Sequence, residues 1–277
     1  MKNRIILLFL IFVFYSCDMF EFRGFITSYE DVDERFEQSI RWNNHTVREI
    51  DVPKSDYTIF SMGDSHVGST KNLDTFFKKA MNENAATSVL VGDLTTGHKE
   101  DYDVFLEHLP VRESLEYFAV AGNHDLYFGG WQYFYSIFGS SSYYFLVNTP
   151  TASDMFICLD SGGGTLGDKQ IEWFENLLMT KRKNYRNCIV FTHNNIFRFR
   201  PTVIANPMVE EIQVLVDLLI RYNVNMLVTA HDHKRNTDIF GNTIYITMDA
   251  LEDSNDNASY LKIHVDDENI NYSFVKL

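Results

Sequence analysis

Cysteine is scarce in this chain of 277 residues, which contains three. Small secreted folds that depend on disulfides carry many more cysteines in a shorter chain, so a disulfide framework is excluded. Cys158 and Cys188 lie inside segments that we expect to be buried strands, where a free cysteine packs as a small hydrophobe. We therefore expect no thiol chemistry. A bridge between these two strands remains the alternative in an oxidising compartment.

The amino terminus lacks an apolar run long enough to cross a bilayer, which takes about 20 residues. Residues 5–14 are apolar, two basic residues precede them, and Ser16 and Cys17 follow. A basic start, a short apolar centre and a small-residue end are typical of an export signal, here residues 1–16. An anchor helix is the lesser alternative.

Cys17 directly after Ser16 resembles a bacterial lipoprotein signal, in which that cysteine becomes the lipidated first residue. We therefore expect export to the bacterial cell envelope. The protein would be held at the membrane by a lipid anchor on Cys17, or released as a periplasmic or secreted protein.

Basic residues are also few, because 24 Lys and Arg stand against 38 Asp and Glu and leave a net charge of −14. A surface so acidic repels polyanions, which excludes a nucleic-acid duplex as a large-surface partner. A small anionic substrate would then need a local positive centre, which bound metal ions can supply. Repeats, low-complexity tracts and interdomain linkers are missing as well.

What the chain does contain is an alternation of apolar strands with amphipathic helices. Alternating strands and helices, followed by a run of strands, predict an α/β fold with a largely parallel sheet and added antiparallel strands. We expect one domain over residues 56–277 and an amino-terminal extension over residues 17–55, which packs against the domain. The expected strands are 57–62, 88–91, 117–121, 143–147, 155–159, 188–192, 226–230, 243–248, 260–265 and 270–275. The expected helices are 30–42, 73–81, 101–109, 168–183 and 208–222.

Polar side chains follow five of these strands at the point where each strand ends. Taken singly, each cluster is weak evidence, because Gly-Asp is usually a turn and a lone histidine usually packs. Open α/β sheets keep their sites at the carboxyl ends of their strands, so the five clusters together predict one site. Residues two apart on extended backbone face the same way, so Asp-x-His and His-x-His can share an ion. The clusters are Asp64-x-His66, Gly92-Asp93, Gly122-Asn123-His124-Asp125, His193 and His231-x-His233.

This set of motifs, over residues 57–233, resembles the calcineurin-like metallophosphoesterases. The resemblance implies a four-layer α/β/β/α sandwich, with two sheets face to face and helices outside, and two metal ions at the strand ends. It implies that one metal is held by Asp64, His66, Asp93 and His233. It implies that the other metal is held by Asp93, Asn123, His193 and His231, with Asp93 bridging. His124 resembles the catalytic histidine of the family, which stabilises the transition state or protonates the leaving group; simple packing is the alternative.

The residue types suit this chemistry. Mixed imidazole and carboxylate ligands favour Mn, Fe or Zn over Mg and Ca, which prefer oxygen ligands. Two such ions lower the pKa of a bridging water and clamp the phosphoryl oxygens during in-line attack. We therefore expect a binuclear-metal phosphoesterase that hydrolyses small phosphomonoesters or phosphodiesters by attack of a metal-bridging hydroxide. No side-chain nucleophile is required, and none is visible at a suitable place.

Departures from related families narrow the class. Asp93 is followed by Leu-Thr-Thr-Gly rather than the Val-Asp-Arg-Gly of phosphoprotein phosphatases, and Thr96 stands where purple acid phosphatases have a tyrosine ligand. The alternatives are a cyclic-nucleotide or nucleotide phosphodiesterase and, in another class, a non-catalytic surface lipoprotein that keeps the fold. Because every ligand position is filled, we favour the enzyme.

Three other features have two interpretations each. The glycine-rich residues 162–169 lack the Gly-Lys-Ser/Thr order of a nucleotide P-loop, so we expect a loop that borders the site. Arg198 and Arg200 either grip a substrate phosphate or, as we favour, are solvated loop charges. The aromatic residues of 127–138 either stack on a base or, as we favour, pack in the core.

Overall fold

The computed structural model describes residues 29–68, 70–197 and 209–277. The predicted export signal, Cys17, and the pair Arg198 and Arg200 lie outside these ranges. None of the helices within them combines the length and the apolar character that crossing a membrane requires.

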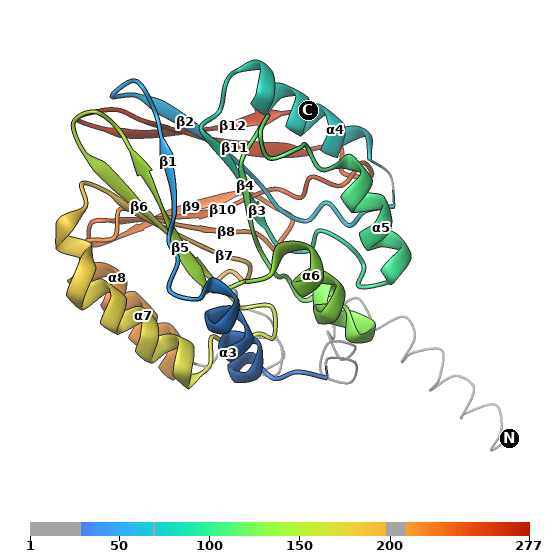
Figure 1. The fold of residues 1–277 in the computed structure, drawn as a ribbon, viewed down its shortest axis with the longest axis horizontal. Coiled ribbons are helices and arrows are strands. Elements are labelled where there is room, and N and C mark those ends of the chain that lie inside the picture. The colour runs from blue at the N-terminus through green and yellow to red at the C-terminus, as the bar shows by residue number, and fades with distance from the viewer. Residues whose placement is uncertain (1–28, 69, 198–208) are drawn as a thin grey trace, which may run out of the picture.

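Two β-sheets pack face to face (Figure 1). The larger sheet has seven strands, in the order β1 (Arg48–Asp51), β5 (Tyr143–Asn148), β6 (Ser153–Leu159), β7 (Cys188–Thr192), β8 (Met226–Thr229), β10 (Thr243–Thr247) and β9 (Asn236–Phe240). The smaller sheet has five strands, in the order β12 (Ile270–Lys276), β11 (Ser259–Val265), β2 (Tyr57–Met62), β3 (Thr87–Val91) and β4 (Tyr117–Val120). Strands β2, β3 and β4 run parallel, and so do β6, β7 and β8.

Helices cover the outer face of each sheet. On the smaller sheet lie α4 (Lys71–Asn82), α5 (Lys99–His108) and α6 (Trp131–Phe138), and on the larger lie α7 (Asp168–Lys181) and α8 (Val209–Arg221). Three separate apolar cores result, one between the sheets and one beneath each helical layer. The molecule is therefore the four-layer α/β/β/α sandwich that the family resemblance implies.

The central parallel strands have continuous apolar sequences because they are covered on both faces. Every residue of β3 and β7 is buried. Side chains alternate across each strand: Val89 and Val91 pack between the sheets, whereas Leu90 packs beneath the helices of the smaller sheet. All five of the strands expected to carry polar residues at their ends are present.

The amino-terminal extension joins the fold more closely than its composition suggests. Its helix, α3 (Val32–Asn43), begins with a capping box between Asp31 and Glu34. It lies between α6 and α7 in Figure 1. The following strand β1 pairs in parallel with β5 at the edge of the larger sheet. The sequence predicts the helix but not β1, because this exposed edge strand has no apolar alternation. The exposed strand β9 is missed for the same reason.

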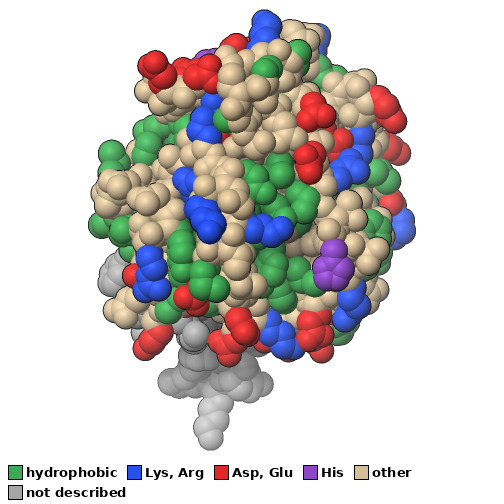
Figure 2. Space-filling model, turned by 60° about the vertical axis from the view of Figure 1, so that its left-hand side comes forward, with side chains coloured by type: hydrophobic (Ala, Val, Ile, Leu, Met, Phe, Trp, Pro, Cys, Tyr) green, Lys and Arg blue, Asp and Glu red, His purple; other side chains and the backbone are tan. Residues whose placement is uncertain are grey.

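Charges of both signs occur on the surface. On the face drawn in Figure 2, acidic and basic side chains are interspersed among apolar ones. A single field of one sign does not dominate this face, although the chain as a whole is strongly acidic.

The two strand cysteines give a direct test of burial. Cys158 and Cys188 are free and fully buried, and burial raises the pKa of both thiols to about 12. In a Cys17→Ser protein at pH 8, both thiols should therefore stay protonated and unreactive toward a disulfide reagent such as DTNB. Two thiols should react after unfolding in urea. Fast reaction of the folded protein would contradict this packing.

Candidate metal centre

The five strand ends converge on one rim of the molecule and bring their histidines and carboxylates together. Within the described residues, three overlapping groups have potential metal-ligand atoms within 4.8 Å of one another. These groups are Asp64 with His66 and His233; Asp93 with His193 and His231; and His66 with Asp93 and His124. Six of the seven ligand positions implied by the family resemblance, together with His124, therefore lie in one place.

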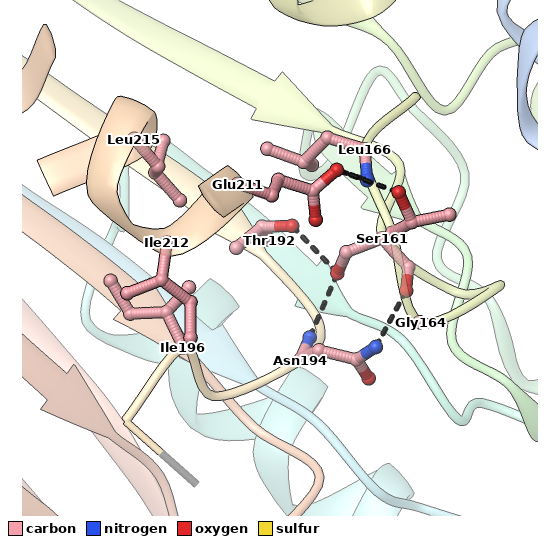
Figure 3. Close-up of a pocket in the computed structure, with 10 residues that line it drawn as sticks. Ser161, Gly164, Leu166, Thr192, Asn194, Ile196, Glu211, Ile212 and Leu215 are labelled. Carbon is pink, nitrogen blue, oxygen red and sulfur yellow. Dashed lines mark hydrogen bonds between the residues drawn. The ribbon is translucent and has the colours of Figure 1, made fainter. Parts of the chain in front are cut away.

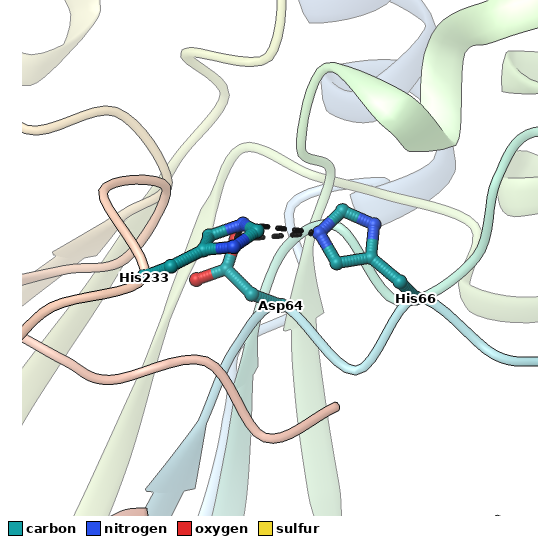
Figure 4. Close-up of side chains that lie close together, drawn as sticks. All are labelled: Asp64, His66 and His233. Carbon is teal, nitrogen blue, oxygen red and sulfur yellow. Dashed lines mark hydrogen bonds and ion pairs between the residues drawn. The ribbon is translucent and has the colours of Figure 1, made fainter. Parts of the chain in front are cut away.

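The first group lies at the ends of β2 and β8 (Figure 4). The Nε2 atoms of His66 and His233 are 3.2 Å apart. Asp64 Oδ1 lies 3.5 Å from His233 Nε2 and 4.0 Å from His66 Nε2. Three potential ligand atoms thus lie around a common point.

The second group lies at the ends of β3, β4, β7 and β8. His193 Nε2 is 3.1 Å from His231 Nδ1 and 3.2 Å from Asn123 Oδ1. The same nitrogen is 3.3 Å from Asp93 Oδ2. Asn123 is thereby placed as a fourth potential ligand, which adds an amide oxygen to the two imidazoles and the carboxylate.

Asp93 connects the two groups. Its Oδ2 lies 3.8 Å from His66 Nε2 in the first group and 3.3 Å from His193 Nε2 in the second. Its other oxygen, Oδ1, accepts a hydrogen bond of 2.7 Å from the backbone N–H of His124. This bond fixes the carboxylate in the orientation that leaves Oδ2 facing both groups.

The backbone of the ligands differs from the prediction. The motifs Asp64-x-His66 and His231-x-His233 predict extended backbone, but β2 ends at Met62 and β8 at Thr229. All four residues, and Asp93, have positive φ values, between 38° and 71°. Side chains two apart therefore do not simply face the same way: His231 joins the second group, whereas His233 joins the first. Such left-handed conformations are unfavourable for non-glycine residues and concentrate at functional sites.

Two glycines allow the loops to approach this closely. Gly92 has a φ of 79°, and a Cβ there would lie 2.5 Å from His193 Nδ1. A Cβ on Gly122 would overlap both the backbone nitrogen and Oδ1 of Asp93. Glycine is therefore required by contact distances at both positions.

Buried charges in the second group shift one another's pKa values. Burial alone would lower the pKa of His193, but the carboxylates of Asp93 and Asp64 outweigh it and raise the pKa to about 10. Burial would likewise raise the pKa of Asp93, but the neighbouring imidazoles, His193 foremost, hold it well below its usual value. The site therefore favours positive charge at its centre.

The donor atoms fit metal ions. His193 Nδ1 lies 2.9 Å from the Val91 carbonyl, which can only accept, so the neutral ring presents a bare lone pair at Nε2. The neighbours of this lone pair, Asn123 Oδ1 and Asp93 Oδ2, are themselves acceptors. Asp64 Oδ1 is buried, and none of the residues that the structure describes donates a hydrogen bond to it. Once His193 has lost its proton, these acceptors face one another without a donor and repel one another unless a metal cation lies between them.

Two neighbours of the candidate ligands have structural roles that the sequence alone does not reveal. The buried carboxylate of Asp125 accepts from the backbone N–H groups of Gly122, Leu94 and Thr95, and so ties the β4 loop to the β3 loop. The hydroxyl of Tyr127 accepts from Asn123 Nδ2 at 3.0 Å, which turns the amide oxygen toward His193. Asp125 was visible within the Gly-Asn-His-Asp motif. The contact of Tyr127 had no local signal.

Substitution of Gly122 tests the packing of the site. Gly122→Ala should displace the Asp93 carboxylate and lower the bound Mn²⁺, measured by elemental analysis after loading and desalting, by at least half. Gly68→Ala is the matched control, because a Cβ there meets nothing closer than 3.8 Å. Equal metal content in the two variants would contradict the assigned geometry.

The comparisons with known proteins agree with this arrangement. A family model described as calcineurin-like phosphoesterase matches residues 57–235. A dimetal phosphatase from Danio rerio is 12% identical with a TM-score of 0.63, over 79% of this chain and 96% of that chain. GAP50, the anchor in the inner membrane complex of Plasmodium, is 14% identical with a TM-score of 0.64, over 80% of this chain and 85% of that chain. At these identities both structures show the fold alone. No curated protein matches this sequence. Because the family model covers more than half of the residues, the chain belongs to the calcineurin-like phosphoesterase family.

Proposed function

We propose that this chain hydrolyses phosphate esters, monoesters or diesters, with two divalent transition-metal ions. The observation that carries the proposal is the position of Asp93 Oδ2, which faces a histidine of each group at 3.8 and 3.3 Å. A carboxylate shared between two sets of imidazole and oxygen donors is the arrangement that a pair of ions requires.

The protein would hold one ion with Asp64, His66, Asp93 and His233, and the other with Asp93, Asn123, His193 and His231. Imidazole nitrogens in both sets favour Mn, Fe or Zn. Such a pair supplies a water of lowered pKa and neutralises charge on the phosphoryl oxygens. Only two carboxylates, Asp64 and Asp93, would offset the four positive charges, so the centre would attract an anionic substrate despite the acidic chain.

His124 is the group best placed to act on the leaving group. Its ring lies against the rings of His66 and Tyr127, with centroids 4.5 and 4.7 Å away, and its backbone N–H is bonded to Asp93. An imidazole held beside the ligands without being required by either set can donate a proton to a departing oxygen.

The cellular setting is part of the proposal. The leader over residues 1–16 and Cys17 support export and a lipid anchor, and the excess of acidic residues supports a small phosphorylated substrate rather than a nucleic-acid duplex. The metal centre would then act in the cell envelope.

Substrate class and catalysis can be separated experimentally. The Mn²⁺-loaded protein should hydrolyse p-nitrophenyl phosphate or bis(p-nitrophenyl) phosphate, and the ratio of the two rates distinguishes a monoesterase from a nucleotide-type diesterase. A non-catalytic protein that keeps the fold would hydrolyse neither ester and would purify without stoichiometric transition metal.

Asp93→Asn should abolish hydrolysis, because the amide removes the negative charge that the two sets share. The expected fall in kcat/KM is at least about 10³-fold. Asp217→Asn, at an exposed position of α8, should leave the rate unchanged. Survival of most activity in Asp93→Asn would contradict the shared-ligand role.

His124→Ala should lower kcat by about 10²–10⁴-fold while leaving the metal content intact. The reason is that its ring lies beside the ligands but is not assigned to either set. His108→Ala on α5 is the control. Loss of metal in His124→Ala would show that the ring is a ligand instead.

A further inference from the structure

The helix α3 of the amino-terminal extension is tied to the turn that follows β6. Arg35 donates from Nε to Asp160 Oδ2 at 2.8 Å and from Nη2 to Asp160 Oδ1 at 3.3 Å. Both side chains are almost fully buried, at 2% and 1% exposure. Arg35 Nη1 also donates to the carbonyl of Glu30, and Asp160 Oδ1 accepts from the N–H of Gly162. The ion pair thereby sets the position of residues 160–162.

This turn lies against the backbone beside Asn123. A Cβ on Gly162 would lie 2.9 Å from the carbonyl oxygen of Gly122 and 3.1 Å from that of Ala121. The glycine therefore sits in contact with the two residues that precede Asn123, and a shift of the turn would press on them or release them.

The same turn holds both neighbours of His193 (Figure 3). Ser161 Oγ lies 2.8 Å from Thr192 Oγ1 and accepts from the N–H of Asn194 at 2.9 Å. The Asn194 side chain donates back to the carbonyl of Ser161 at 2.7 Å. His193 is therefore bracketed by two residues that are bonded to one serine.

A second route leads from α3 to the same place. The N–H of Ser141 donates to Ser39 Oγ on α3 at 3.1 Å, and Ser141 Oγ accepts from the N–H of Ala121 at 2.8 Å. Both serines are fully buried. The helix thus reaches the β4 loop through Ser141 as well as through the turn after β6.

Helix α3 also spans the two halves of the sandwich. Gln38 accepts from Trp131 Nε1 on α6 at 2.8 Å, whereas Phe36 packs on Trp173 of α7 with ring centroids 5.9 Å apart. Helix α6 covers the smaller sheet and α7 covers the larger sheet. Helix α3 therefore connects the two helical layers at the rim that carries the site.

We propose that α3 is a positioning element for the second ligand set, and that Arg35 is the positioning residue through which it acts. The inference rests on the proposed metal centre. The turn at residues 160–162 contacts the neighbours of Asn123 and His193. Among the hydrogen bonds and ion pairs of the described residues, none joins this turn to Asp64, His66 or His233. Loss of Arg35 should therefore selectively weaken the binding of the ion held by the second ligand set.

The chain offers a matched control on the same strand. Asp154 near the start of β6 forms a comparable pair with Arg186, at 3.0 and 2.6 Å, at the end of the strand opposite the site. Arg35→Met and Arg186→Met each break an Arg–Asp pair whose carboxylate is buried, although Arg186 itself is 17% exposed. Both should lower Tm by roughly 10 °C, but only the first should disturb metal binding.

The experiment is a calorimetric titration of metal-free protein with Mn²⁺, together with a thermal melt. Wild type and Arg186→Met should each bind two ions, and the affinities should be similar in the two proteins. Arg35→Met should bind the ion of the second ligand set about 10–100-fold more weakly. Gly162→Ala, which keeps the ion pair but presses the turn away from Gly122, should give the same selective loss with a smaller change in Tm.

The outcomes separate the two proposals. Wild type that binds no metal would overturn both. If wild type binds two ions and Arg35→Met or Gly162→Ala binds them equally well, the role of α3 is overturned and the proposed metal centre is not. Equal weakening in Arg35→Met and Arg186→Met would do the same, because it would reduce the effect to general destabilisation.

Discussion

The structure of this site depends on one carboxylate, that of Asp93, which is held where two strand-end groups meet. Its Oδ1 is fixed by the backbone N–H of His124, so Oδ2 must face the imidazoles of His66 and His193. The neighbouring loops approach so closely that Gly122 cannot carry a side chain. Five of the seven candidate ligands in these loops have left-handed backbone. A cation between these groups relieves the repulsion among acceptors that burial would otherwise leave unbalanced.

The sandwich supplies that carboxylate with partners from both sheets. The smaller sheet delivers Asp64, His66, Asp93 and Asn123, and the larger sheet delivers the three remaining histidines. The relative position of the sheets therefore sets the distance between potential ligands. Between the sheets, Phe118 stacks on Phe145 with centroids 3.7 Å apart. At the edge, α3 contacts helices of both layers. The packing that holds the two sheets together therefore also sets the geometry of the site.

The sequence predicts the central strands, and the gathering of polar residues at their ends, for a physical reason. Parallel strands covered on both faces must be continuously apolar, and polar residues can follow only where such strands emerge. The edge strands β1 and β9 escape prediction because exposure removes that pattern. The left-handed backbone of the loops is not predicted, because the identities of the candidate ligand residues do not indicate their backbone conformation. The pair of Arg35 with Asp160 joins residues 125 positions apart, and nothing local marks either as a partner.

The most direct test of the shared carboxylate is a crystal structure of the protein grown with Mn²⁺, with anomalous diffraction used to locate the ions. The account predicts two anomalous peaks about 3.5–4 Å apart, one on each side of Asp93. One peak should lie among Asp64, His66 and His233, and the other among Asn123, His193 and His231. A single peak away from Asp93, or no peak at this rim, would contradict it.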